Sequence, residues 1–307
     1  MNDAPPRRCE VEEEVLMNAA TTHDSALQVR KPDIAPEAGA FVWSKTAEFA
    51  IAYNGYSAII PAVEYYLNNV MREVSAKVAA SDPAFRDELV TFIKQEAMHS
   101  RLHEVFNKRL AAMQIAGLQE LIDEMKTHLA MLLRTRPLAF NAAYCAGFES
   151  IATYAALYLY TQCDEYFDGA DAHGANLLLW HVAEEFEHRS VCHDAFDHVS
   201  GSYVARLHGL VYALLHVWHG LRRGEVLVLK HYTRDMPEAE RKAAIRRSNR
   251  LLRRKALFLA PKLLKVFLPR YHPSQTPMPE RITRALGIFA QPGPIRRRVD
   301  YLGALQH

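Results

Sequence analysis

The chain has 307 residues, of which half are hydrophobic and 23% are charged, as in an ordinary water-soluble globular protein. The N-terminal sequence MNDAPPRRCEVEEEV lacks the apolar core of a signal peptide, and no apolar run is long enough to cross a membrane, so we expect a cytoplasmic protein. The four cysteines form no CxxC pair, which argues against a zinc ribbon or a redox motif and indicates free thiols.

The charge is unevenly distributed along the chain, although the net charge is only +2. Residues 221–307 carry 20 Lys and Arg against 6 Asp and Glu. Within them, residues 237–270 mix cationic clusters with apolar side chains, which is typical of helices on anionic membrane surfaces. A peripheral contact with the inner membrane surface is one expectation; pairing with the acidic part of the chain, or a homodimer contact, is the alternative. No nucleic-acid-binding motif accompanies the charge, so no nucleic acid partner is expected.

Gly and Pro are sparse between about residues 50 and 270, which favours an all-α fold. We expect three segments. Residues 1–40 should be irregular and residues 41–235 should form a helical bundle. Residues 236–307 should form basic helices and a tail that pack on or near this bundle. The first helix should begin at Ser57, with Pro61 in its first turn. The following helices are expected at about 83–115, 118–133, 138–162 and 175–198, then from 203 toward 230, and at 237–258 as a basic helix.

Two of these expected helices carry a Glu-x-x-His motif. Glu96 and His99 lie in QEAMHSRLH, and Glu185 and His188 lie in WHVAEEFEHR. Residues three apart on a helix share a face, so each motif points a carboxylate and an imidazole at one spot. Ferritin-like di-iron and di-manganese proteins use two such motifs and one further Glu from each of two other helices. The doubled motif therefore predicts a ferritin-like bundle if two further carboxylates exist.

The other two expected long helices each supply a carboxylate where an apolar residue would be usual. Glu149 is the one acidic residue of the helix at 138–162, and an unpaired buried carboxylate is costly unless it binds a metal. Glu64 shares an apolar stripe with Val63 and Leu67 on the first helix. His181 stands four residues before Glu185 on the same face, so it is a further candidate ligand.

The donor types suit two iron ions, with manganese or zinc as alternatives, because carboxylate and imidazole are present without thiolate. His103, four residues after His99, is a candidate either for ligation or for orienting a ligand through a hydrogen bond. Gln95, Glu184 and Asp194 are further candidates for that orienting role.

The motif segments QEAMHSRLH and WHVAEEFEHRSV resemble a bacterial family usually called predicted metal-dependent hydrolases, which belongs to the ferritin-like superfamily; the resemblance covers roughly residues 40–270. The pattern of His181, Glu185 and His188 is also similar to the last metal helix of di-iron arylamine N-oxygenases, in which the leading His is an additional iron ligand. This second resemblance implies the ligand set Glu64, Glu96, His99, Glu149, His181, Glu185 and His188.

The main functional hypothesis from the sequence is a di-iron oxidase or oxygenase that uses O2 to oxidise a small hydrophobic substrate. The apolar helix at 138–162 would wall the substrate pocket and exclude water. Metal-dependent hydrolysis is the alternative, because two metals can activate water and stabilise an oxyanion. A non-catalytic metal-binding or interaction protein is the third possibility.

Overall fold

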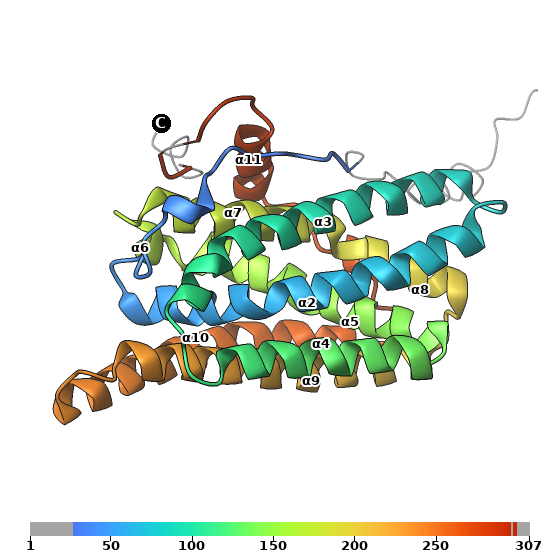
Figure 1. The fold of residues 1–307 in the computed structure, drawn as a ribbon. Coiled ribbons are helices and arrows are strands. Elements are labelled where there is room, and N and C mark those ends of the chain that lie inside the picture. The colour runs from blue at the N-terminus through green and yellow to red at the C-terminus, as the bar shows by residue number, and fades with distance from the viewer. Residues whose placement is uncertain (1–26, 296, 300–307) are drawn as a thin grey trace, which may run out of the picture.

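The computed structural model describes residues 27–295 and 297–299, and regular structure within them is helical apart from one isolated bridge between Asp33 and Pro294 (Figure 1). The prediction of an all-α fold is therefore confirmed. The longer helices are α2 (Ala47–Val78), α3 (Pro83–Ala112), α4 (Leu118–Thr135), α5 (Leu138–Gln162), α7 (Ala172–Glu187), α9 (Tyr203–Tyr232) and α10 (Glu238–Val266). The short elements are η1 (Pro36–Ala38), α6 (Asp164–Phe167), η2 (His188–Ser190), α8 (Val191–Val199), η3 (Pro273–Gln275) and α11 (Glu280–Phe289).

Helix α5 is the apolar central helix of the fold. It packs against α2, α7, α8, α9 and α10, and most of its side chains are buried, as expected of a helix that is apolar on all sides. Helices α2 and α3 form a long antiparallel pair joined by a short turn (Figure 1). Asp82 fixes the start of α3 because its side chain accepts a hydrogen bond from the backbone N–H of Phe85 at 2.9 Å.

The start of the first long helix was predicted wrongly. Helix α2 begins at Ala47, ten residues before the predicted cap Ser57, and Pro61 lies inside it rather than in its first turn. The sequence pattern placed a break at Gly55. In the structure Gly55 instead lies inside the helix where α2 crosses α9, and a Cβ there would lie 2.6 Å from the backbone N of Glu225. The glycine is therefore required by close helix packing and does not end a helix.

Two other helix boundaries also differ from the prediction. The expected helix at 175–198 is interrupted by the 3-10 turn η2, which begins at His188, so this residue lies just beyond α7. Helix α10 continues through Pro261 to Val266 instead of ending near residue 258. Most of the predicted irregular segment 1–40 lies outside the described residues, and the divisions at 40 and 235 stay predictions.

The basic helix α10 lies along the bundle, and some of its cations pair with acids from the first part of the chain. Arg247 Nη2 lies 2.8 Å from Glu48 Oε1, and Arg254 forms an ion pair with Glu165. Among the described helices, none is both long and apolar enough to span a membrane. The expected membrane-surface contact of residues 237–270 stays a prediction.

Replacing Gly55 with alanine should destabilise the fold by about 1–3 kcal/mol, because the new Cβ meets backbone atoms of Glu225 and Gly224 that cannot move aside cheaply. The matched control is Gly287→Ala on α11, where a Cβ meets nothing within 4 Å; it should leave stability unchanged or raise it by about 0.5–1 kcal/mol. Urea denaturation measures both, and equal midpoints for Gly55→Ala and wild type would contradict the close crossing of α2 and α9.

Candidate metal centre

Helices α2, α3, α5 and α7 and the turn η2 bring together in the interior seven side chains of the types that can bind a metal. Each of these side chains is at most 1% exposed. They are Glu64 from α2, Glu96 and His99 from α3, Glu149 from α5, His181 and Glu185 from α7, and His188 from η2. The sequence-predicted set is thus gathered in one place, and its role as a ligand set stays a prediction.

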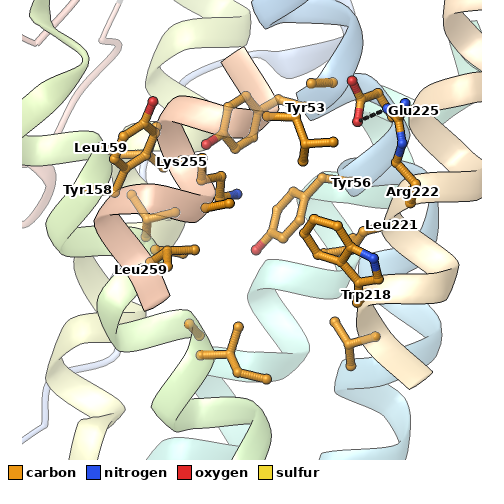
Figure 2. Close-up of a pocket in the computed structure, with 18 of the residues that line it drawn as sticks. Tyr53, Tyr56, Tyr158, Leu159, Trp218, Leu221, Arg222, Glu225, Lys255 and Leu259 are labelled. Atoms are coloured by element: carbon orange, nitrogen blue, oxygen red, sulfur yellow. Dashed lines mark ion pairs between the residues drawn. The ribbon is translucent and has the colours of Figure 1, made fainter. Parts of the chain in front are cut away.

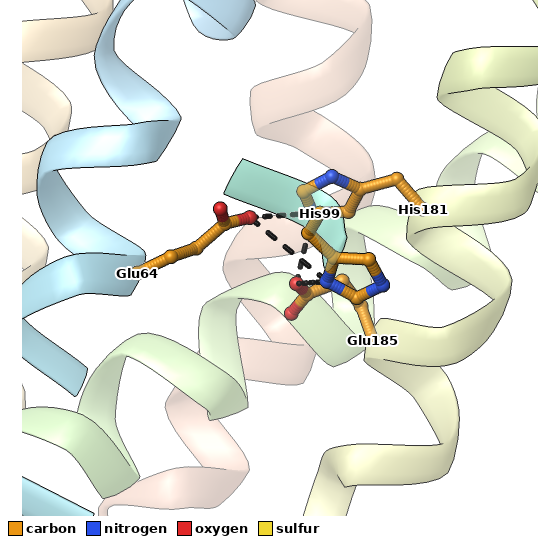
Figure 3. Close-up of side chains that lie close together, drawn as sticks. All are labelled: Glu64, His99, His181 and Glu185. Carbon is orange, nitrogen blue, oxygen red and sulfur yellow. Dashed lines mark hydrogen bonds and ion pairs between the residues drawn. The ribbon is translucent and has the colours of Figure 1, made fainter. Parts of the chain in front are cut away.

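The seven side chains form two groups of four that share one carboxylate. Within each group, one ligand atom per residue lies within 4.8 Å of all the others. The first group is Glu64, His99, His181 and Glu185, shown in Figure 3, and the second is Glu96, Glu149, Glu185 and His188. Because Glu185 belongs to both, the arrangement has two adjacent positions for a cation with a carboxylate between them.

In the first group the nitrogen atoms face the carboxylates. His181 Nε2 lies 2.8 Å from Glu185 Oε1 and 3.6 Å from Glu64 Oε1. His99 Nδ1 lies 3.7 Å from Glu185 Oε1 and 3.9 Å from Glu64 Oε1. Two imidazoles from different helices therefore converge on the same pair of carboxylates (Figure 3).

Many of the converging atoms have no hydrogen-bond partner. Glu96 Oε1 and His188 Nδ1 face each other at 2.8 Å as an ion pair. Other buried atoms of the cluster have no hydrogen-bond partner, namely Glu64 Oε1, Glu96 Oε2, His99 Nδ1, both carboxylate oxygens of Glu149, and Glu185 Oε2. Buried polar atoms are normally paired, because leaving one unsatisfied costs free energy. Atoms of this chemistry, unpaired and aimed at two common points, fit metal ions.

The electrostatics of the cluster also indicate a missing positive charge. Burial, reinforced by the neighbouring carboxylates, raises the pKa of Glu64 and Glu149 well above the usual range and that of Glu185 to about 7. For Glu96 burial acts in the same direction but is outweighed by His188 and His99, so its pKa is lowered. The protein alone therefore does not compensate four carboxylates at this position.

The three candidate ligand histidines are each in polar contact, through their second ring nitrogen, with a residue behind the cluster. His99 Nε2 lies 2.9 Å from Glu184 Oε2, and His181 Nδ1 lies 2.6 Å from His103 Nε2. His188 Nε2 lies 3.2 Å from the Gln95 side-chain oxygen. Such contacts fix the orientation of metal-binding imidazoles and increase their basicity.

Of the residues predicted to orient ligands, Asp194 is not brought to the centre. It lies on α8, where it accepts a hydrogen bond from His272 at 2.9 Å. His103 lies behind His181 and is bonded on its other side to the Ser57 hydroxyl at 2.8 Å, so its place is that of an orienting residue.

Three contacting residues were not found from the sequence. Ser100 donates a hydrogen bond to Glu64 Oε2 at 2.7 Å, and the Tyr56 hydroxyl lies 3.0 Å from His181 Nε2. Tyr56 precedes Glu64 by eight residues, so helical spacing would have placed both on one face if the start of α2 had been predicted correctly. Arg30 reaches Glu184 from the irregular N-terminal segment at 3.1 Å, and no local pattern marks it.

A cavity of about 300 Å³ adjoins the centre (Figure 2). Its walls come from α2, α5, α7, α9 and α10 and are mostly apolar and aromatic. Glu185 lines it, and so does Tyr56, which projects into its middle (Figure 2). Glu185, which the two donor groups share, therefore also borders a cavity in which a small apolar molecule would fit.

Comparison with known proteins agrees with a metal-dependent activity. A match to the family described as predicted metal-dependent hydrolase extends over residues 28–276, which includes all seven candidate donors and every helix that lines the cavity. No curated protein and no solved structure matches the chain. The family match spans most of the sequence and encloses the buried donor groups, and on this basis the chain belongs to the predicted metal-dependent hydrolase family.

Proposed function

We propose that this chain is an enzyme that uses two metal ions to hydrolyse a small apolar substrate. One observation carries the proposal: Glu185 belongs to both donor groups and also lines the apolar cavity. A substrate bound in the cavity would therefore lie against the two cation positions. The description of the family supports hydrolysis as the reaction class.

In this proposal, one set of residues would bind the ions and another would position the substrate. The seven donors would hold two ions, which when bound can activate a water molecule and stabilise an oxyanion. The Tyr56 hydroxyl, at the boundary of cavity and centre, can donate a hydrogen bond to a substrate oxygen. The apolar walls exclude bulk water, so only water admitted to the centre can react.

A second candidate function is O2-dependent oxidation of an apolar substrate at a di-iron centre. It is favoured by the donor set, because carboxylate and imidazole without thiolate suit iron and manganese as well as zinc. The mostly apolar walls of the cavity also limit side reactions with water, which oxidative chemistry requires. The same seven residues would serve either reaction, so the metal and the substrate decide between them.

Activity assays of protein loaded with different metals can distinguish hydrolysis from oxidation. Protein loaded with Zn(II) or Mn(II) without O2 should hydrolyse chromogenic esters of apolar acids, and Glu185→Gln should lose this activity because both donor groups lose a ligand. The metal-free protein is the control. Absence of hydrolysis with every metal, together with O2 uptake by the Fe(II)-loaded protein in an oxygen electrode, would contradict hydrolysis and support oxidation.

The shared carboxylate also predicts a pattern of metal content. Wild-type protein should bind about two ions per chain, as in other carboxylate-bridged bundles. Glu149→Gln and His181→Asn each change one group only and should leave about one ion, whereas Glu185→Gln should leave fewer than either. Elemental analysis after dialysis measures this. An unchanged metal content in Glu149→Gln would remove that residue from the ligand set.

Replacing Glu184 with glutamine should weaken metal binding by about ten- to hundredfold, because His99 loses the charged partner behind it. Asp194→Asn makes the same chemical change on α8, away from the centre, and should leave the affinity unchanged. Competition with a metallochromic chelator measures both. Equal losses in the two variants would mean that the effect is not specific to the ligand histidine.

A further inference from the structure

The cavity extends along the bundle away from the metal centre. Along α5 it is lined from Phe148, next to Glu149, to Leu159, a span of roughly 16 Å at 1.5 Å per residue. Helix α2 runs in the opposite direction beside it: Phe49 near its start stacks on Tyr166, just beyond the end of α5. The cavity thus has a metal end and a far end.

A lysine lies at the far end of this cavity. Lys255 on α10 lines the cavity, and its Nζ lies 5.2 Å from the ring centroid of Tyr53 (Figure 2). Leu251, Leu252 and Leu259, at spacings of three and four residues from Lys255, line the same cavity. The lysine therefore belongs to the apolar face of α10 that covers the cavity and not to its solvent-facing cationic side.

Lys255 differs from Arg222, the other basic residue of the cavity wall, because it forms no ion pair with a carboxylate. Arg222 and Glu225 form an ion pair at 2.8 Å, and Glu225 also accepts a hydrogen bond from Ser248. Within the described part of the chain, no carboxylate lies within ion-pair distance of Lys255 Nζ. Lys255 is half-buried, and this burial lowers its pKa against the smaller opposing effects of Cys163 and Glu225.

We infer that the cavity binds an aliphatic or aromatic acid, with its carboxylate at Lys255 and its apolar body extending toward Glu185. A cavity for a wholly neutral molecule would gain nothing from an unpaired ammonium group in its wall, since a methionine would fill the same space without a desolvation cost. In combination with the proposed function, on which this last step rests, the reacting bond lies at the end of the substrate remote from the acid group.

Isothermal titration calorimetry with decanoate and decanol tests the inference, since the two ligands differ in the head group alone. Wild-type protein should bind decanoate about tenfold or more tightly than decanol, the effect of one charge-assisted contact. Lys255→Met should bind both with similar affinity. Lys262→Met is the matched control: Lys262 also lies on α10 over an aromatic ring, that of Phe258, but does not line the cavity, and its replacement should preserve the preference.

The titrations are made with metal-loaded and with chelator-treated protein, because a carboxylate could instead bind the metal ions. A preference for decanoate that survives in Lys255→Met, or that disappears on chelation of the wild type, would overturn the inference. Equal binding of the two ligands by the wild type, or binding of neither, would do the same. Binding as expected without turnover of any substrate would contradict the proposed function alone, and circular dichroism confirms that each variant is folded.

Discussion

The burial of four carboxylates at one point in a helical bundle is the constraint on which the rest of the structure depends. Withdrawing ionised groups from water costs several kcal/mol each unless charge and hydrogen bonds replace the water. Here the hydrogen bonds are only partly supplied, since Glu64, Glu96, Glu149 and Glu185 each have at least one carboxylate oxygen without one. Further polar contacts, such as that of Glu184 with His99, lie behind the candidate ligands and orient them. The unsatisfied oxygens on the inner side of the cluster are therefore the atoms to which cations could bind.

Helical periodicity was sufficient to predict which buried acidic and imidazole side chains come together, because it relates sequence spacing directly to a shared helix face. Glu149 stands out as the one carboxylate of an apolar helix, and the structure places it fully buried beside Glu185. Residues that reach the centre from irregular segments carry no such signal, and Arg30 is of this kind. Gly55 was misinterpreted because the sequence cannot distinguish a glycine that ends a helix from one that lets two helices touch.

The packing position of α10 also could not be predicted from its local sequence pattern. Its sequence shows cationic clusters alternating with leucines, which predicts an amphipathic helix but not what covers its apolar face. In the structure that face, including Leu251 and Leu259, closes the cavity, and cations such as Arg247 pair with acids of the preceding helices. Part of the basic charge of the C-terminal residues is therefore paired within the molecule, between α10 and the acidic part of the chain.

The charge balance along the cavity determines how a substrate would lie in it. Two divalent ions, as proposed, would balance four carboxylates, so a loaded centre would present little net charge to the cavity. The ion pair of Arg222 and Glu225 is neutral as well. Lys255 is then the unbalanced charge on the cavity wall, and in an apolar surrounding its field is screened less than in water. An acid group is drawn to that end, and this leaves the apolar end of the molecule for the metal centre.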